Sequence, residues 1–488
     1  MGTYKTPGVY IVEKNAFPNS VVEVETAVPA FVGYTEIAMD GTHSLLKKAF
    51  KINSFNEFEI YFGGANKPIF TFSKKEIENQ EVKKENTGEE PITGYPLIVN
   101  KTEYVLQKPK NLFTLYNNIR LYFANGGGPC YIVSIGNYLS EIKKDDFIDG
   151  IEVLKEEQEP TMVVIPEAIN NEFDGPIQQL MLDHCAKMQS RIAILDVADD
   201  PSQNTKSISD TFRDKVKSNL SYGAAYFPYL QTSVLTEKDV TYKNLDADSL
   251  ALCMKDANGS DIPPKNETQS ETDFHNLLYQ NSPLYKEVVT EIRNILNLLP
   301  PSAAMAGIFT MVDNERGVWK APANVPVNQV VSLSRILTNT EQEDLNVTMN
   351  GKSINAIRYF TGEGIKVWGA RTLDGNSLDW RYINVRRTMI FLEQSIKNAA
   401  RAYVFEPNVA ATWLTMKCMI ENFLRGVWKR GGLAGTTPED AFEVHVGLGD
   451  TMTAEDILDG YLRITILVAI SHPAEFIEIT FQQQMQKS

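Results

Sequence analysis

The stretch PAFVGY, residues 29–34, is the first of five short apolar runs that decide the fold of this chain. A continuous apolar run of this length is typical of a strand that is buried on both faces. The four later runs are Pro129–Ile135, Thr161–Ile165, Arg191–Val197 and Gly223–Leu230. Helical patterns accompany them near Ser54–Phe62, Leu112–Asn125, Phe147–Glu156, Pro176–Met188 and Thr211–Val216. Strands that alternate with helices indicate βαβ units, so the sequence predicts an α/β domain with a largely parallel sheet.

Two polar segments interrupt this pattern, near residues 74–90 and at residues 236–282. The first is rich in Lys and Glu, and the second is crowded with Asp, Asn, Lys, Ser, Thr and Pro. Such compositions are typical of surface loops and hairpins, because they offer few apolar side chains to bury. We therefore expect both segments to be surface insertions in an α/β domain of residues 28–340, and the second to contribute no packed core.

The C-terminal part contains two long amphipathic helices that follow Asp379. In the first helix, apolar residues recur at spacings of three and four, at Val385, Met389, Leu392, Ile396, Ala400 and Tyr403. Four basic residues are expected on the opposite side: Arg386, Arg387, Lys397 and Arg401. The second helix is expected to open at Asn408, a favourable N-cap, and to stop at the glycines 431 and 432. A strand near Tyr461–Ile470 follows, which makes this part α+β.

Each terminal region carries a short strand pattern that stands alone. The N-terminal pattern is Val9, Tyr10, Ile11 and Val12, and the C-terminal one is Phe476, Ile477, Ile479 and Phe481. A lone strand cannot satisfy its own backbone groups, so each must pair with a sheet in its own subunit or in another one. Two spare strands are therefore an arrangement suited to exchange between subunits.

The distribution of charge along the chain indicates which kinds of partner the protein could bind. The 488 residues carry a formal charge of −15, which gives no electrostatic footprint for non-specific binding to nucleic acid. Between Asp379 and Arg430, however, nine basic and four acidic residues give a local charge of +5. This basic stripe is either a solvated helix face or a surface that docks on an acidic partner.

Neither a secretory signal nor a membrane span is expected from the pattern of apolar residues. The cysteines Cys130, Cys185, Cys253 and Cys418 lie too far apart in sequence for a metal knuckle or a redox pair. We therefore expect synthesis and assembly in a cytoplasm, and any later release by a route other than a signal sequence.

No motif in the sequence supports a catalytic, cofactor or metal site. Residues 350–353, Asn-Gly-Lys-Ser, end like a phosphate-binding loop, but Asn346 stands where that motif needs its first glycine. A hairpin turn at Asn350-Gly351 is the better interpretation. The five histidines lack metal-ligand spacing, and no nucleophile elbow is present, although a triad assembled in space stays open.

Several landmarks resemble contractile tail sheath proteins of phages, bacteriocins and phage-derived injection systems. They are residues 4–10 (YKTPGVY), 26–35 (TAVPAFVGYT), 300–302 (PPS) with 316–324, 368–372 (WGART) and 380–387 (WRYINVRR). Their order along the chain matches the family, and they cover both ends and the middle.

The resemblance implies a helical sleeve of identical subunits around an inner tube, which contracts to drive the tube through a target envelope. It implies an N-terminal arm at 1–27, an outer α/β domain at 28–340, an inner tube-facing α+β domain at 341–470 and a C-terminal strand arm at 471–488. The partners would be further copies of the chain, the tube, a baseplate and a terminal cap, without nucleic acid, membrane span or cofactor. The particle would assemble in a bacterial cytoplasm and could be released from the cell.

With this resemblance, the basic stripe of Arg386, Arg387, Lys397 and Arg401 is predicted to face the tube, and a contact with an acidic neighbouring subunit is the alternative. Two other classes of function stay open. One is an α/β enzyme, either a hydrolase or a nucleotide-dependent protein, and the other is a filament that does not contract.

Overall fold

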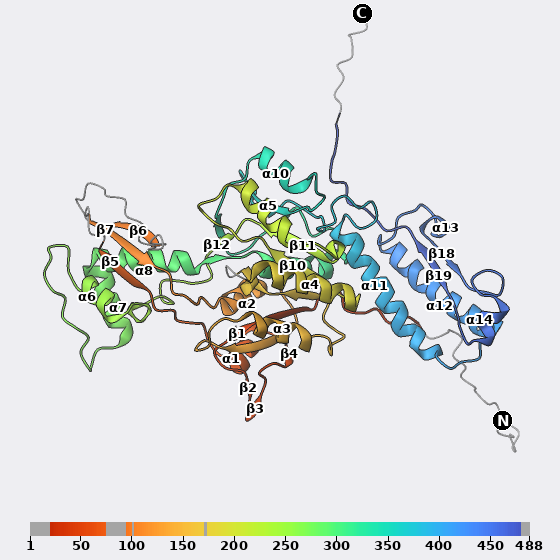
Figure 1. The fold of residues 1–488 in the computed structure, drawn as a ribbon, viewed down its shortest axis with the longest axis horizontal. Helices are drawn as coiled ribbons and strands as arrows, with labels where there is room; N and C mark the ends of the chain where they lie inside the picture. Colours follow the sequence, from red (N-terminus) through yellow and green to blue (C-terminus); the bar gives the residue numbers. More distant parts are fainter. Residues whose placement is uncertain (1–19, 75–93, 100–101, 170–172, 480–488) are drawn as a thin grey trace, which may run out of the picture. The chain divides into compact units, whose positions relative to one another are not determined.

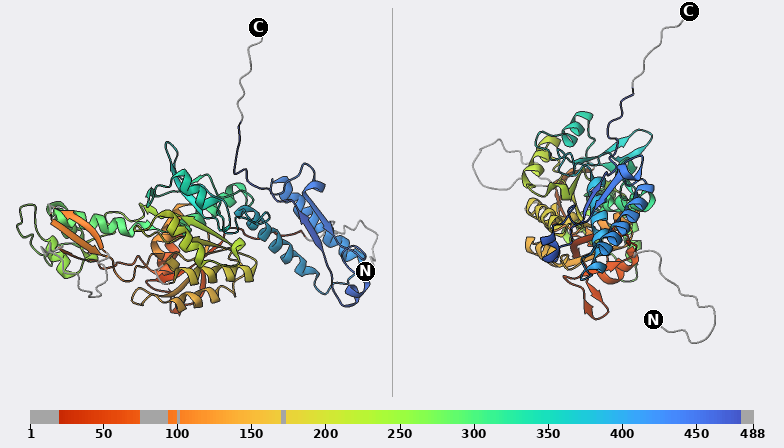
Figure 2. Two further views of the ribbon diagram at one scale, coloured as in Figure 1. Left: turned by 45° about the horizontal axis from the view of Figure 1, so that its top comes forward. Right: turned by 90° about the vertical axis from the view of Figure 1, so that its right-hand side faces the viewer.

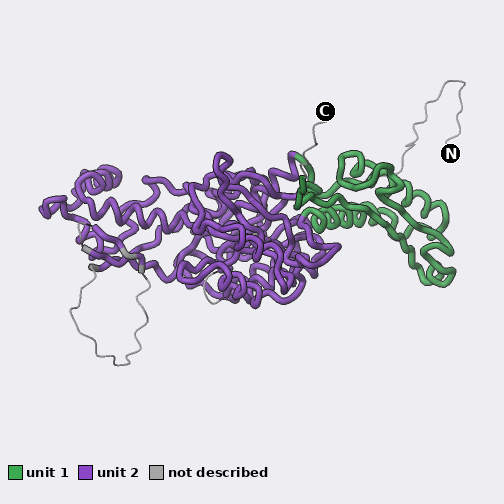
Figure 3. Tube along the Cα trace, turned by 90° about the horizontal axis from the view of Figure 1, so that it is seen from above, with its two compact units in different colours: residues 1–26, 316–320, 384–488 green, residues 27–315, 321–383 purple. Residues whose placement is uncertain are grey.

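The computed structural model describes residues 20–74, 94–99, 102–169 and 173–479. Two compact units divide the chain (Figure 3). Unit 1 comprises residues 1–26, 316–320 and 384–488, and unit 2 comprises residues 27–315 and 321–383. The boundary therefore lies between Ile383 and Asn384, and not near residue 340 as the sequence suggested.

A nine-stranded sheet forms the centre of unit 2, in the order β14-β17-β16-β11-β10-β9-β1-β8-β4. Six neighbouring strands are parallel: β1 (Pro29–Thr35), β8 (Cys130–Asn137), β9 (Met162–Val164), β10 (Ile192–Asp196), β11 (Gly223–Phe227) and β16 (Asn355–Phe360). Antiparallel strands flank them: β4 (Ala49–Ile52), β17 (Gly364–Val367) and β14 (Val325–Pro326). The five predicted strands are thus confirmed as β1, β8, β9, β10 and β11.

Helices cover both faces of this sheet (Figure 1). One face packs against α1 (Phe55–Phe62), α2 (Leu115–Ala124) and α9 (Ser302–Arg316). The other packs against α3 (Lys144–Val153), α4 (Asp174–Met188), α5 (Thr205–Lys215) and α10 (Asn339–Asn346). Successive strand residues alternate between the two cores: Phe31 belongs to the first, and Ala30 and Val32 belong to the second. This explains why each strand is apolar at nearly every position.

The predicted boundary failed because β16 and β17 complete the central sheet. Ile357, Ile365 and Val367 belong to the first core, so the segment from residue 341 to 383 is part of unit 2. Two small antiparallel elements accompany this sheet: the hairpin β2 (Met39–Asp40) and β3 (His43–Ser44), and the sheet of β13 (Leu298–Leu299), β12 (Leu230–Thr232) and β15 (Val330–Leu333).

Residues 236–282, the second polar segment, contribute to a third hydrophobic core, which we call the satellite core. It joins the sheet of β5 (Thr71–Lys74), β7 (Thr102–Gln107) and β6 (Gly94–Val99) to α6 (Ala247–Cys253), α7 (Glu271–Asn281) and α8 (Pro283–Leu296). Val240, Leu245 and Phe274 are buried in it. The expectation that residues 236–282 supply no packed core is therefore corrected. Most of the first polar segment, residues 75–93, lies outside the described residues.

Unit 1 consists of two long helices and a small sheet. In it, α11 (Ile383–Ala400) and α12 (Ala410–Lys429) lie side by side, with Phe391 and Phe423 in ring contact at 5.9 Å (Figure 2). The strands β18 (Phe442–His445) and β19 (Thr465–Val468) pair antiparallel and pack on α12. Two short helices, α13 (Pro438–Ala441) and α14 (Ala454–Leu458), stand in the connections around β18. Both predicted helices and the predicted strand near Tyr461–Ile470 are thus confirmed.

Candidate assembly surfaces

The carboxyl edge of the central sheet is where an α/β protein with this strand order would bind a ligand. The order β8-β1-β9-β10-β11 reverses direction at β1, and helix N-termini beside such a point commonly hold anions. Here the buried carboxylate of Glu167, just after β9, occupies that position. It accepts hydrogen bonds from the backbone N–H groups of Thr114 (2.8 Å) and Leu115 (3.1 Å) at the start of α2, and of Tyr34 (3.1 Å) in β1.

A second buried carboxylate, on the neighbouring strand β10, also accepts a hydrogen bond from the start of a helix. Asp196 ends β10, is buried, and accepts a 2.7 Å hydrogen bond from the backbone N–H of Ser302, the first residue of α9. Burial raises the pKa of both carboxyls to about 7, against the lowering effect of their N–H donors. Two anion-binding positions that a nucleotide-dependent enzyme would use are therefore filled by side chains of the chain itself.

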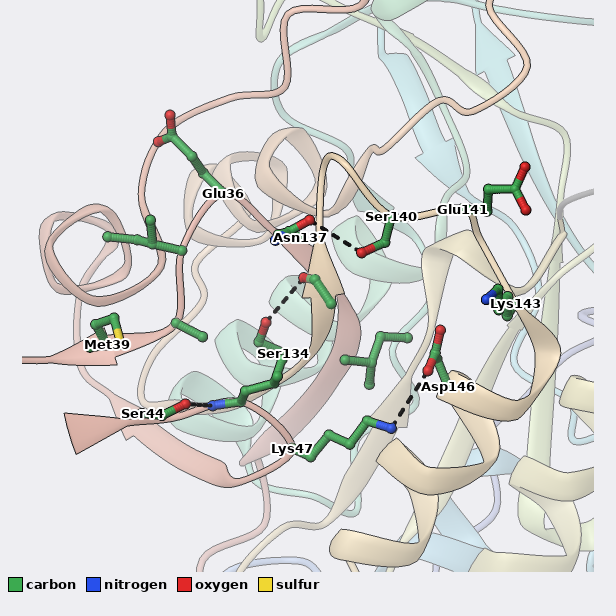
Figure 4. A pocket seen from close by; sticks show the side chains of 15 residues that line it. Glu36, Met39, Ser44, Lys47, Ser134, Asn137, Ser140, Glu141, Lys143 and Asp146 are labelled. Atoms are coloured by element: carbon green, nitrogen blue, oxygen red, sulfur yellow. Dashed lines mark hydrogen bonds and ion pairs between the residues drawn. The ribbon is translucent and has the colours of Figure 1, made fainter.

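A pocket of about 660 Å³ opens at the carboxyl ends of β1 and β8 (Figure 4). Several of its polar side chains form ion pairs or hydrogen bonds within the chain. Lys47 pairs with Asp149 at 2.7 Å and with Asp146 at 3.5 Å, and the Ser140 hydroxyl donates to the Asn137 side chain at 3.2 Å. The pocket thus contains several polar groups that are paired within the chain.

The sequence that ends like a phosphate-binding loop also binds internally. Lys352 Nζ donates to the carbonyl of Arg213, and Ser353 Oγ donates to the carbonyl of Asn346 at 2.6 Å. Gly351, with φ +76°, forms a turn as predicted. The turn joins α10 to β16, so the prediction of a hairpin between two extended segments is wrong.

Two residues of the predicted basic stripe on α11 are buried, and the other two are exposed. Arg386 and Arg387 are only 6% and 4% exposed, whereas Lys397 and Arg401 are exposed. The first turns of α11 are enclosed by other segments of unit 1. Arg387 donates to the carbonyl of Thr26 at 2.9 Å, and the Asn384 amide donates to the carbonyls of Trp319 (2.9 Å) and Ser471 (3.0 Å). The expectation that all four basic side chains lie on an exposed face is therefore corrected.

The N-terminal segment of unit 1 contacts both long helices of that unit. The backbone N–H of Val24 donates to Ser395 Oγ at 3.2 Å, and the Glu23 carboxylate forms a two-pronged ion pair with Arg430. The Arg430 guanidinium also lies over the Trp319 ring, 5.2 Å from its centroid. These contacts hold Glu23 and Val24 against α12 and α11.

The last described segment is extended and apolar. Phe476, Ile477 and Ile479 are 75%, 78% and 69% exposed, and residues 471–479 belong to no strand of the described chain. Phe481 and the N-terminal pattern Val9, Tyr10, Ile11 and Val12 lie outside the described residues. Within the described ranges, β18 and β19 have only each other as strand partners, apart from a single bridge between Leu433 and Ile470 beside β19. In the described part of unit 1, an apolar segment without a strand partner thus accompanies a sheet whose β18 edge carries no further strand.

Two family models match the chain. The phage tail sheath protein central domain matches residues 140–373, and the phage tail sheath C-terminal domain matches residues 376–484. Together they cover more than half of the chain, in the order that the family has. The chain belongs to the phage tail sheath family.

Sheath proteins of known sequence and structure agree with this assignment. The chain is 26% identical to a prophage major tail sheath protein of Pseudomonas aeruginosa over 199 residues, which are 39% of the chain and 48% of that protein. It is 25% identical to the tail sheath protein of Enterobacteria phage T4 over 135 residues, 28% of the chain and 20% of that protein. The match therefore spans between a fifth and about a half of these relatives.

Solved structures extend the likeness over nearly the whole chain. The sheath complex of an extracellular contractile injection system, PVC, in its contracted state is 26% identical, with a TM-score of 0.62 and 99% of both chains covered. The contracted helical sheath of the anti-feeding prophage is 27% identical, with a TM-score of 0.62 and coverage of 99% of this chain and 100% of that one. The mixed α/β fold predicted from the sequence is thus confirmed as a sheath fold.

Two features of this sheath subunit were missed from its sequence. Asn408 does not cap α12, whose N-cap is Val409; its side-chain amide instead donates to the carbonyl of Tyr461 at 2.9 Å. The Glu23–Arg430 pair could not be found because 407 positions separate the two residues. Among the residues that the structure describes, none of the helices has the length and apolar character needed to cross a membrane, and no cluster of potential metal ligands occurs.

Proposed function

We propose that this chain is the structural subunit of a contractile sheath, which polymerises helically around an inner tube and contracts to drive the tube through a target envelope. The observation that supports it best is the unpaired apolar segment Phe476–Ile479 in the same unit as the open-edged β18–β19 sheet. A segment that has no strand partner among the described residues of its own copy can add as a strand to the sheet of the next copy.

Strand addition would also determine the geometry of assembly. A contact between two different surfaces of identical subunits gives a ring where the rotation between neighbours closes, and an open helix where it does not. Main-chain hydrogen bonds between neighbours can persist while the folded units rotate, provided that flexible segments connect the added strand to its own unit. The N-terminal pattern Val9–Val12 is proposed to act in the same way as Phe476–Phe481.

Contraction is then a rigid-body rearrangement of subunits that stay linked. The extended sheath would store free energy when it assembles on the tube, and the contracted lattice would be lower in free energy. This scheme requires no nucleotide, cofactor or metal. It agrees with Glu167 and Asp196 occupying the helix N-termini at which a nucleotide phosphate would bind.

The partners proposed for this subunit are further copies of itself, an inner tube, a baseplate and a terminal cap. A chain of the anti-feeding prophage baseplate structure, 28% identical with a TM-score of 0.60, supports the association with a baseplate. The particle is proposed to assemble in a bacterial cytoplasm, as part of a phage tail or of a tail-like particle that can be released. Of the predicted tube-facing residues, Lys397 and Arg401 keep this proposed role because they are exposed.

Electron microscopy of the purified chain, alone and with its tubes, tests the proposal. We expect sheaths in two lattices, a long narrow one on tubes and a short wide one after contraction. A single tube diameter under all conditions would favour the filament that does not contract. Globular particles at all concentrations would contradict the sheath and favour the enzyme class.

A further inference from the structure

The β18–β19 sheet of unit 1 (Figure 1) carries a histidine between two carboxylates on one of its faces. Phe442 and Val444 of β18 are buried, and α12 packs on this strand. Glu443 and His445 alternate with them, so they lie on the opposite face. His445 Nε2 is 3.2 Å from the Glu443 carboxylate, and its Nδ1 is 3.4 Å from the carboxylate of Asp450. We call these last three side chains the histidine cluster.

The strand β19 runs beside the histidine cluster without adding a charge, since its residues opposite the cluster are Thr465 and Leu467. Arg463, just before β19, is paired with Asp456 at 2.9 Å. The short helix α13 carries Glu439 and Asp440, and the second of these accepts a hydrogen bond from Thr437 Oγ1 at 3.0 Å. On the other face of the sheet, α12 has the charged residues Lys417, Glu421, Arg425 and Lys429. While its imidazole is neutral, the histidine cluster itself thus carries two negative charges and no positive one.

The C-terminal segment of a neighbouring copy would bring a third carboxylate to this cluster. Along residues 476–479, the two isoleucines fall on one side of an extended strand, and Glu478 falls on the other. The isoleucines suit the side that packs on α12, where a carboxylate would be buried at a high cost in free energy. Glu478 would then share the face of the histidine cluster. On a strand added next to β18, opposite residues have Cβ atoms about 4.5–5.5 Å apart, which is close enough for an ion pair.

The charge of His445 would decide whether this third carboxylate is repelled or attracted. In a sheet, like charges that lie opposite each other destabilise the strand pair, and opposite charges stabilise it. Three carboxylates around a neutral imidazole would repel the added strand, whereas an imidazolium among them would attract it. Histidine is the side chain that ordinarily changes its charge between about pH 5 and pH 8, a range in which carboxylates are ordinarily ionised. Addition of the strand should therefore be favoured at the acidic end of this range.

We propose that protonation of His445 regulates the addition of the C-terminal strand of one copy to β18 of the next, through Glu478 of the added strand. This inference rests on the strand addition proposed above. The contact between the added strand and β18 is weaker when His445 is neutral and stronger when it is protonated. By linkage, the added strand increases the affinity of His445 for a proton to the same extent. Sheath formation should therefore take up protons near neutral pH.

The test is the concentration at which the full chain begins to form sheath, measured by sedimentation at low salt, at about pH 5.5 and about pH 8. The unaltered chain should assemble at a roughly two- to fivefold lower concentration at the lower pH, which is the effect of one exposed cross-strand ion pair. His445→Gln is neutral at both pH values and should lose this difference, at the higher concentration. His445→Lys is charged at both and should lose it at the lower concentration. The His445 side chain is 41% exposed, so neither change should unfold the free subunit.

Glu478→Gln tests the partner of His445, because it removes the carboxylate of the added strand and keeps the shape of the side chain. At the higher pH it should assemble at a lower concentration than the unaltered chain, and it should respond little to pH. His43→Gln is the matched control, since His43 is an exposed histidine of β3 in unit 2, and it should keep the full response. The buried carboxyls of Glu167 and Asp196 are common to all these variants, so their titration cancels in the comparison.

If the unaltered chain forms no sheath at either pH, the proposed function fails and this inference fails with it. If it forms sheath and His445→Gln responds to pH as the unaltered chain does, His445 is not the regulator, while the sheath function stands. If His445→Gln loses the response but Glu478→Gln keeps it, the proposed pairing with the added strand is overturned. Proton uptake on assembly, followed with an indicator dye in weakly buffered solution, should be smaller in His445→Gln, and equal uptake would also contradict the inference.

Discussion

Glu167 shows how a single carboxylate can close a position that many α/β proteins use for ligands. Three backbone N–H groups from two elements converge on it, and a Cβ atom at Gly33 would lie 2.9 Å from its Oε2. Glycine is therefore required at position 33 for this close approach. The side chain ties β1, β9 and the start of α2 together at the carboxyl edge of the sheet. Its function in the sheath subunit is to stabilise the fold.

The pKa of Glu167 leads to a prediction about stability and pH. The pKa is about 7 in the folded chain and about 4.5 when unfolded, so folding takes up a proton between these pH values. The free energy of unfolding should therefore fall as pH rises from about 4.5 to about 7, and this contribution should be constant above pH 7. Glu167→Gln should weaken this dependence by about 1–3 kcal/mol between pH 5 and pH 8. Denaturant unfolding at both pH values measures it.

Glu343→Gln is the control, because Glu343 is an exposed carboxylate of the same unit. It should leave the difference between pH 5 and pH 8 unchanged. Equal differences in the unaltered chain and in Glu167→Gln would show that the buried carboxyl does not titrate in this range. The sequence held one signal for these residues, since Glu167 and Asp196 are acidic residues at the end of buried apolar strands. It held none for their donors, which are backbone groups of distant helices.

At the scale of elements, α11 shows that the spacing of apolar residues within one helix does not predict which of its other residues are exposed. The spacing of its apolar residues predicted one buried side and one exposed side, which requires solvent along the whole helix. The first two turns are instead enclosed by segments that begin near residues 20, 316 and 471, so Arg386 and Arg387 are buried as well. A pattern within one helix cannot reveal which distant segments cross it. In the last turn Lys397 is exposed, as predicted.

The satellite core leads to a prediction about the segment that seemed too polar to fold. Phe274 on α7 is buried and lies 5.0 Å from the Tyr242 ring, measured between ring centroids. Phe274→Ala should destabilise this core by about 3–5 kcal/mol, because it removes a buried ring and leaves a cavity. Hydrogen exchange in α7 and α8 should rise, while exchange in β1 and β10 stays slow. Glu267→Ala, at an exposed site in the same segment, should change neither, and equal protection in Phe274→Ala would argue against a packed satellite core.

The composition of residues 236–282 led to the wrong prediction, because it averages over the whole segment and hides the few residues that are buried. Residues 236–282 are mostly polar, yet their few apolar residues, such as Leu245 and Phe274, meet apolar residues of β5, β7 and α8. These residues are buried because they pack against residues that lie up to about two hundred positions away in the sequence. The strands of the central sheet were predictable because each one is buried on both faces and carries its own signal. The satellite core, which joins residues 236–282 to β5, β6, β7 and α8, carries no such local signal.

At the scale of the whole molecule, the order of landmarks predicted the family, and the fold and the comparisons confirm it. The division into units was harder, because β16 and β17 join the central sheet after an excursion through α8, α9 and α10. Contacts between subunits are not encoded in one chain's own packing. They are visible only indirectly, as apolar surface or strand edges that the single chain leaves unused.

The C-terminal segment gives the test at this scale. Ile477 is exposed and lies in no strand, so Ile477→Pro should leave the thermal midpoint of the single subunit unchanged. In a strand added to a neighbour, proline removes a ladder hydrogen bond and clashes with regular pairing, so sheath formation should be lost or need a much higher protein concentration. One such hydrogen bond contributes only about 0.5–1.5 kcal/mol, but the defect recurs at every subunit of the helix. Ile477→Val, which suits a strand equally well, should assemble like the unaltered chain, as seen by sedimentation and electron microscopy. Normal sheaths from Ile477→Pro would mean that the segment does not pair as a strand, and the exposed apolar residues around it would need another partner.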